Sequence, residues 1–240
     1  MREPTMIWKR TAQFHLNRWR KEARVDNIRL PLSNRIISPG MEWTLAKGRY
    51  EWGEARMSAR VLKPGESVLE LGAGLGFVSS YIRLNTDAGQ ITCIEANPDL
   101  VPYIEGVHRL NGISNAAVVN GVAQVADYPA SIPFYCRKDF WASSMEPAVD
   151  YERAVEVPVL NFTNLLATAR PDVLVMDIEG AELDLLEADA LPHVRAIVLE
   201  VHKDVYGRRG LERLFERAKH LGFHRDPNGT VREVHTLVRN

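Results

Sequence analysis

The sequence of 240 residues has few cysteines, no long apolar run and no excess of either charge. Its two cysteines, Cys93 and Cys136, belong to no CxxC motif, so neither a zinc site nor a disulfide framework is expected. No run of 18 apolar residues is present and the first residues lack the apolar core of a signal peptide, which predicts a cytoplasmic protein without a membrane span. Thirty Lys and Arg against 31 Asp and Glu exclude a globally basic protein, so nucleic acid is not an expected partner.

From residue 67 onward, short apolar runs alternate with helical patterns, which is typical of a parallel sheet with helices on its faces. The runs that we predict as strands are residues 67–71, 90–95, 116–119, 172–177 and 194–201. An Asp-Pro-Asn-Gly turn at 226–229, followed by the alternating run 230–238, predicts an antiparallel hairpin at the end of the chain. Residues 132–141 are expected to form an inserted strand or loop.

The N-terminal part of the chain has a different character. Residues 5–24 place Trp8, Leu16 and Trp19 at helical spacing, and residues 1–30 hold eight basic against three acidic side chains. Residues 31–40 contain prolines typical of a linker, and a second helix is predicted over 42–62. We therefore divide the chain into an N-terminal helical arm or lid, residues 1–45, and a catalytic domain, residues 46–240. The arm could close over an anionic acceptor, cap the domain, join a dimer or lie on a membrane surface.

The strongest motif is a glycine-rich loop between a strand and a helix, at residues 72–76. Its sequence is Gly72-Ala73-Gly74-Leu75-Gly76, preceded by the apolar run 68–71 and followed by Phe77. Glycine permits the tight turn and the close approach of a ligand, and the helix N-terminus offers free N–H groups.

Two classes of cofactor suit such a loop. A dinucleotide site has Gly-x-Gly-x-x-Gly, whereas here Phe77 stands where the third glycine would fall. Glu70, two residues before the loop, would repel a pyrophosphate but suits a cationic amino-acid ligand. The spacing resembles motif I of the Rossmann-like methyltransferases that use S-adenosylmethionine.

Two further strand ends complete this predicted cofactor site. Glu95 ends the second strand about 20 residues after the loop, where a carboxylate can accept hydrogen bonds from ribose hydroxyls, and Ala96 and Asn97 follow it. The third strand ends at Gly121. Many methyltransferases have an aspartate next, to bind adenine, but this chain has Val122, so backbone groups or Gln124 would take that role.

A second constellation is Asp177-Ile178-Glu179-Gly180-Ala181-Glu182, at the end of the fourth strand. Together with the glycine loop it resembles the FkbM family of methyltransferases, and so do Tyr50-Glu51, Trp141-Ala142-Ser143-Ser144 and Leu199-Glu200-Val201-His202. The resemblance covers roughly residues 45–205. It implies an α/β Rossmann-like class I methyltransferase fold, with a mostly parallel seven-stranded sheet, a C-terminal antiparallel hairpin and an N-terminal helical extension.

The resemblance also implies a function and a set of site residues. The function is O-methylation of a small molecule or sugar, with S-adenosyl-L-methionine as cofactor. The predicted cofactor-binding residues are Glu70, Gly72, Ala73, Gly74, Gly76, Phe77, Glu95, Ala96, Asn97, Gly121 and Val122.

For the acceptor we predict contacts with Trp141, Ser143 and Ser144, and for catalysis Asp177, Glu179 and His202. Asp177 or His202 would be the base and Glu179 would orient its partners. Glu182 is expected to accept hydrogen bonds from N–H groups at the start of its helix. No metal ligands are assigned, although an Asp, Glu and His cluster can hold Mg²⁺ or Mn²⁺. A nicotinamide-dependent oxidoreductase and a non-catalytic nucleotide- or partner-binding domain are the alternatives.

Overall fold

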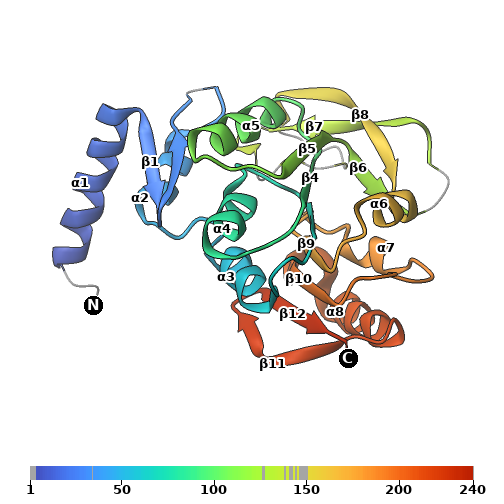
Figure 1. Ribbon diagram of the computed structural model, residues 1–240. Helices are drawn as coiled ribbons and strands as arrows, with labels where there is room; N and C mark the ends of the chain where they lie inside the picture. Colours follow the sequence, from blue (N-terminus) through green and yellow to red (C-terminus); the bar gives the residue numbers. More distant parts are fainter. Residues whose placement is uncertain are drawn as a thin grey trace.

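The computed structural model describes residues 4–33, 35–125, 128–137, 139–140, 143, 145 and 151–239. At its centre is a sheet of seven strands (Figure 1). In spatial order these are β11 (His224–Val231), β12 (Val234–Val238), β10 (Ala196–Glu200), β9 (Val173–Met176), β3 (Val68–Leu71), β4 (Ile91–Glu95) and β5 (Ala116–Asn120). The strands from β10 to β5 are parallel, and β12 is antiparallel to both of its neighbours. The predicted α/β fold with a mostly parallel sheet is confirmed.

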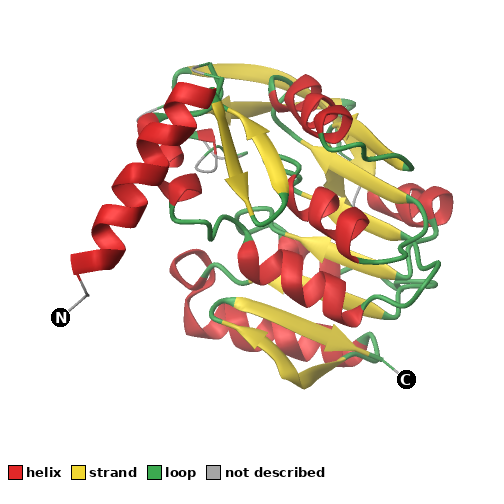
Figure 2. Cartoon of the chain, turned by 60° about the vertical axis from the view of Figure 1, so that its left-hand side comes forward, coloured by secondary structure: helices red, strands yellow, loops and turns green. Residues whose placement is uncertain are grey.

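Helices cover both faces of the sheet, because alternate side chains of each buried strand point to opposite sides. Val68 and Val173 face one side, and Leu69 and Leu174 face the other. The first side packs against α3 (Trp52–Val61), α4 (Phe77–Asn85) and α5 (Leu100–Leu110), and the second against α6 (Phe162–Ala169), α7 (Glu182–Leu186) and α8 (Lys203–His220). Figure 2 shows this layering. No helix in the described part of the chain is long and apolar enough to cross a bilayer.

A smaller sheet of three strands, in the order β6-β8-β7, lies beyond the β5 edge. Its strands are β6 (Val122–Gln124), β7 (Ser131–Cys136) and β8 (Arg153–Asn161). The predicted insertion at 132–141 therefore begins as a strand. Its partner β8 was not predicted, because exposed and partly buried side chains follow one another in this strand without a long apolar run.

The N-terminal arm is only partly helical. It consists of α1 (Pro4–Arg20), the hairpin of β1 (Glu22–Val25) and β2 (Ile28–Pro31), and α2 (Pro39–Ala46). The predicted helix over 5–24 is thus too long, because residues 23, 25, 28 and 30 alternate inward as strand residues and are at most 1% exposed. Helix α1 projects from the side of the domain with Trp19 80% exposed (Figures 1 and 2).

Two other predictions of local structure are wrong. The helix expected over 42–62 is interrupted between α2 and α3, where Gly48 and Glu51 have positive φ angles of 65° and 43°. The hairpin turns at Arg232, whose φ is 58°, and not at 226–229. The Asp-Pro-Asn-Gly segment instead interrupts the register of β11 as a bulge, where the Asp226 carboxylate accepts from the Asn228 N–H at 2.9 Å and pairs with Arg60.

Candidate active site

The glycine loop connects β3 to α4 beside the end of β9. The Asp177 N–H donates to the carbonyl of Leu71 at 3.0 Å, which joins the two strand ends. Gly72 has φ +82°, and a Cβ there would lie 1.8 Å from the carbonyl oxygen of Asp177. Gly74 has φ +53°, and its Cβ would lie 2.7 Å from Glu51 Oε1. Position 72 therefore requires glycine, because a Cβ there would collide with backbone, and position 74 favours it, because side chains pack against the loop at that point.

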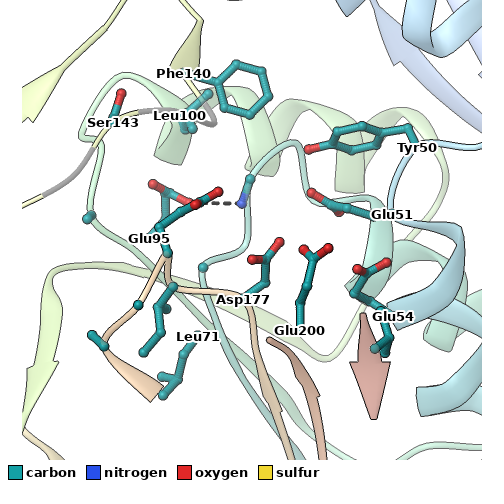
Figure 3. A pocket seen from close by; sticks show the side chains of 18 of the residues that line it. Tyr50, Glu51, Glu54, Leu71, Glu95, Leu100, Phe140, Ser143, Asp177 and Glu200 are labelled. Atoms are coloured by element: carbon teal, nitrogen blue, oxygen red, sulfur yellow. Dashed lines mark hydrogen bonds between the residues drawn. The ribbon is translucent and has the colours of Figure 1, made fainter. Parts of the chain in front are cut away.

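Glu95 fixes the loop from the end of β4. Its carboxylate accepts a hydrogen bond from the N–H of Gly74 at 2.9 Å (Figure 3). It also accepts one from the N–H of Asn97 at 2.8 Å. The residue is 6% exposed, and burial raises the pKa of its carboxyl to about 7, although the backbone donors act in the opposite direction. Glu95 therefore joins the glycine loop to the segment after β4, and one edge of its carboxylate borders the cleft.

A cleft of about 1240 Å³ opens at the carboxyl ends of β3, β4, β9 and β10. Of the residues that we predicted in the site, those that line it are Gly72, Gly74, Glu95, Ala96, Gly121, Val122, Ser143, Asp177 and Glu179. The complete lining contains eight acidic and four basic residues, so the cleft carries an excess of negative charge. Ligands of open α/β sheets bind at this edge.

The acidic side of the cleft is built by residues around the start of α3 and the ends of β9 and β10. Figure 3 shows the carboxyl groups of Glu51, Glu54, Asp177 and Glu200 side by side. The Tyr50 hydroxyl donates to Glu51, whose other oxygen is buried without a hydrogen-bond partner among the described residues. Burial raises the pKa of Glu51 and of Asp177 well above their usual values, and raises that of Glu54 to about 7; neighbouring carboxylates add to each shift. A positively charged ligand would relieve the repulsion among these four carboxylates, so this side of the cleft favours binding of positive charge.

His202 lies behind these carboxyl groups and does not line the cleft. Its Nε2 is 3.5 Å from Asp177 Oδ1 and 3.4 Å from Glu179 Oε2, and its Nδ1 is 3.5 Å from Glu182 Oε1. Burial acts to lower its pKa, but the carboxylates outweigh burial and raise the pKa to about 9. At neutral pH the ring is therefore an imidazolium, which stabilises the ionised forms of Asp177 and Glu179.

Glu182 supports this cluster from beneath. It is fully buried and accepts from the N–H groups of Ile178, at 3.0 Å, and Gly180, at 3.1 Å, as well as from the Tyr206 hydroxyl. Burial acts to raise the pKa of Glu182, but hydrogen bonds from His202, Tyr206 and the N–H groups of Ile178 and of Glu182 itself hold the pKa below its usual value. The carboxylate thus holds the strained turn after β9, in which Glu179 has φ 54°.

The opposite wall of the cleft belongs to the insertion between β6 and β8. Phe134, Arg137, Phe140, Ser143 and Met145 line it, and the Ser143 hydroxyl accepts from the Arg137 N–H at 3.0 Å. Trp141 and Ser144, which we predicted as acceptor contacts, lie outside the described residues.

Several predicted cofactor residues lie behind the lining and not in it. Glu70 is 2% exposed and accepts from the Cys93 thiol at 3.1 Å, because alternate residues of β3 face opposite sides and this one points toward α4. Ala73, Gly76, Phe77 and Asn97 are also absent from the lining. Gln124, the predicted alternative contact for adenine, is 6% exposed and directs its amide at Met145.

Sequence reasoning missed Glu54 and Arg137 altogether. Glu54 stands one helical turn after Glu51, so a signal was available in the i, i+3 spacing of two acids at the start of a helix. Nothing in the sequence around Arg137 distinguishes it from the other basic residues of the chain.

The strand order and the glycine-rich loop after β3 are those of the Rossmann-like class I methyltransferase fold. A family profile described as the FkbM methyltransferase domain matches residues 70–225, well over half of the sequence. The chain therefore belongs to the FkbM methyltransferase family, and its methyl donor is S-adenosylmethionine. The resemblance found in the sequence is confirmed.

Comparison with solved structures gives weaker likenesses. The precorrin-6y C5,15-methyltransferase of Geobacter metallireducens has 14% identity and a TM-score of 0.47, over 79% of this chain and 88% of that one. The P. horikoshii TYW2 in complex with MeSAdo has 16% identity and a TM-score of 0.49, over 90% and 68%. The ribosomal protein L11 methylase of Lactobacillus delbrueckii has 14% identity and a TM-score of 0.47, over 81% and 80%. No curated protein matches the chain.

Proposed function

We propose that this methyltransferase transfers a methyl group to a hydroxyl oxygen of a small molecule or sugar. The observation that carries the proposal is the position of Asp177, a carboxylate that lines the cleft at the end of β9, directly beside Gly72. A hydroxyl is a weak nucleophile at neutral pH, and a base within reach of its proton accelerates attack by about 10²–10⁴-fold. A carboxylate at this position supports such a reaction.

The residues of the cleft fit S-adenosylmethionine. Gly72 and Gly74 bring the backbone of the loop to the surface of the cleft, and the carboxylate of Glu95 would bind the ribose hydroxyls. The carboxylate of Glu51, which lies against Gly74, would attract the positively charged amino-acid end. When bound, S-adenosylmethionine supplies a methyl group on a positively charged sulfur, which leaves with the bonding electrons as a neutral thioether.

The surrounding side chains divide the remaining work. Asp177 accepts the proton that the acceptor hydroxyl loses as its oxygen attacks. His202, which the sequence also suggested as the base, is a positioning residue, because its raised pKa keeps it protonated at neutral pH and it lies behind the lining. Glu179, which lines the cleft 3.4 Å from His202, orients the acceptor. Ser143 and its neighbours in the insertion form the opposite wall.

The proposal is tested by identifying the atom that receives the methyl group. Purified protein is incubated with S-adenosylmethionine labelled with ¹³C in its methyl group and with a panel of sugar and small-molecule alcohols, amines and activated carbon acids. We expect an O-methyl product by NMR, formed more slowly by Asp177→Asn. Exclusive labelling of nitrogen or carbon contradicts the proposal.

A further inference from the structure

Three carboxylates in the cleft converge on one point from three different elements. Glu54 comes from α3, Asp177 from the end of β9 and Glu200 from the end of β10, and one oxygen of each lies within 4.8 Å of the others. Figure 3 shows the three side chains directed to the same part of the cleft. Ligand oxygens on opposite sides of a hard divalent cation are separated by about 4–5 Å, twice the usual bond length. The spacing therefore suits such an ion without rearrangement.

Glu54 gives independent support for a bound cation. It is 7% exposed and its side chain accepts only from its own backbone N–H, so no other described residue donates to it. Asp177 Oδ1 is likewise buried without a hydrogen-bond partner in the described chain. A buried carboxylate with so few donors is costly in its ionised form unless it takes up a proton or binds a cation, and a cation at this point would serve all three carboxylates at once.

The positive groups nearby do not satisfy the three carboxylates. Among the described residues, His202 is their only ion-pair partner, at 3.5 Å from Asp177 and 3.8 Å from Glu200, and it makes none with Glu54. His202 is also shared with Glu179 and Glu182. One imidazolium thus faces several acids. The charges of His202 and Arg232 both act on Glu54, but neither forms an ion pair with it among the described residues.

A second group that could hold an ion, formed by Asp177, Glu182 and His202, is less suitable. The oxygens of Glu182 already accept from the N–H groups of Ile178 and Gly180 and from the Tyr206 hydroxyl. An ion there would have to break these bonds. The carboxylates of Glu54, Asp177 and Glu200 have fewer hydrogen-bond donors than Glu182, and the set contains oxygen only, which is the preference of Mg²⁺, Mn²⁺ and Ca²⁺.

We propose that Glu54, Asp177 and Glu200 bind a divalent cation of the Mg²⁺ or Mn²⁺ class, which holds the hydroxyl oxygen of the acceptor. This role in the reaction rests on the proposed function. A cation bound to the acceptor oxygen lowers the pKa of the hydroxyl. Its proton then passes to the second oxygen of Asp177, and the methyl group forms its new bond to the metal-bound oxygen as its bond to sulfur breaks.

The test is a calorimetric titration of the full-length protein, stripped with EDTA, with MnCl₂ alone. We expect one Mn²⁺ per chain, and at least tenfold weaker binding in both Glu54→Gln and Glu200→Gln. Two variants are used because Glu54 is buried; Glu200 has 31% of its side chain exposed and tolerates replacement more easily. Thermal unfolding shows that each variant is folded.

The matched control is Glu233→Gln. Glu233 also lines the cleft, but its side chain is 45% exposed and pairs with Lys203 at 3.1 Å, outside the group of three. We expect its Mn²⁺ affinity to stay within about twofold of the native protein. Absence of Mn²⁺ binding to the native protein overturns the proposal. An equal loss of Mn²⁺ affinity in all three variants also overturns it, because the ion would then respond only to the general negative charge of the cleft.

A parallel titration with S-adenosylhomocysteine in EDTA separates this proposal from the proposed function. If Glu54→Gln weakens this ligand tenfold while Mn²⁺ binding is unchanged, Glu54 serves the cofactor and the metal proposal fails. If the native protein binds Mn²⁺ as expected but shows no transfer to any alcohol, the cation site stands and O-methylation fails.

Discussion

Replacing Gly74 by alanine adds one methyl group at the point where the loop meets Glu51. The new Cβ would lie 2.7 Å from Glu51 Oε1 and 2.9 Å from the Tyr50 hydroxyl, both closer than real contacts allow. Both atoms end flexible side chains, so they can move aside, but the movement carries the Glu51 carboxylate away from the loop. We therefore expect the main effect on cofactor binding and only a small effect on folding.

The expected losses of stability and of cofactor affinity in Gly74→Ala follow from a comparison with Gly112→Ala. Gly112 also has a left-handed backbone, with φ +67°, but a Cβ there meets nothing within 4 Å. Each variant should lose about 1–2 kcal/mol of unfolding free energy from the left-handed conformation alone. Gly74→Ala should in addition bind S-adenosylhomocysteine at least tenfold more weakly, a loss of about 1.4 kcal/mol.

The assay combines urea unfolding with calorimetric titration of S-adenosylhomocysteine into both variants. Equal affinity in Gly74→Ala and Gly112→Ala would refute the reasoning, because it would show that the ligand does not approach the loop at Gly74. A much larger stability loss in Gly74→Ala would show that Glu51 is too tightly held to move.

Three further predictions concern other parts of the molecule. Glu95→Ala should weaken S-adenosylhomocysteine binding by ~1–3 kcal/mol, measured by calorimetry, since hydrogen bonds to a charged group are lost. His202 has a pKa of about 9 in the folded protein against 6.5 as its ordinary value, so the stability it contributes is complete below about pH 6.5 and is lost as the pH rises through 9. The melting temperature of the native protein should therefore fall more over that interval than that of His202→Gln. Deleting residues 1–30 should unfold the domain, seen as loss of a cooperative thermal transition, because β1 and β2 contribute fully buried side chains.

Each of these has a result that would contradict it. Unchanged affinity in Glu95→Ala removes that carboxylate from the cofactor site. If the melting temperatures of the native protein and His202→Gln depend on pH in the same way, the neighbouring carboxylates do not raise the pKa of the His202 ring. A truncated protein that folds but has lost methyl transfer would support the role of residues 1–45 as a lid, which remains a prediction.

The fold was largely predictable because buried parallel strands leave a strong signal. The apolar runs before the glycine loop and before Asp177 became β3 and β9, within a residue or two of their predicted bounds. The hairpin turn was not predictable from local residues, because the Asp-Pro-Asn-Gly sequence also suits a bulge, and pairing with Arg60, far away in the chain, holds it there.

The site was predictable where it depends on strand ends and less so elsewhere. Glu95 and Asp177 line the cleft because the carboxyl ends of parallel strands meet at one edge. The position of Glu70 outside the lining was predictable, because this residue alternates with Leu69 and Leu71, which face the other side of the sheet. The spacing of Glu51 and Glu54 indicates one acidic helix face, but the meeting of that face with Asp177 and Glu200 depends on the packing of α3 across the sheet, which the spacing does not reveal.

The central claim, that Asp177 takes the proton from an acceptor hydroxyl, is tested most directly by comparing turnover and cofactor affinity in Asp177→Asn. Once an acceptor alcohol has been found, we predict that kcat falls by about 10²–10⁴-fold while the Kd for S-adenosylhomocysteine stays within about twofold. A variant that keeps most of its kcat, or one whose kcat falls only in proportion to lost cofactor binding, would contradict the claim.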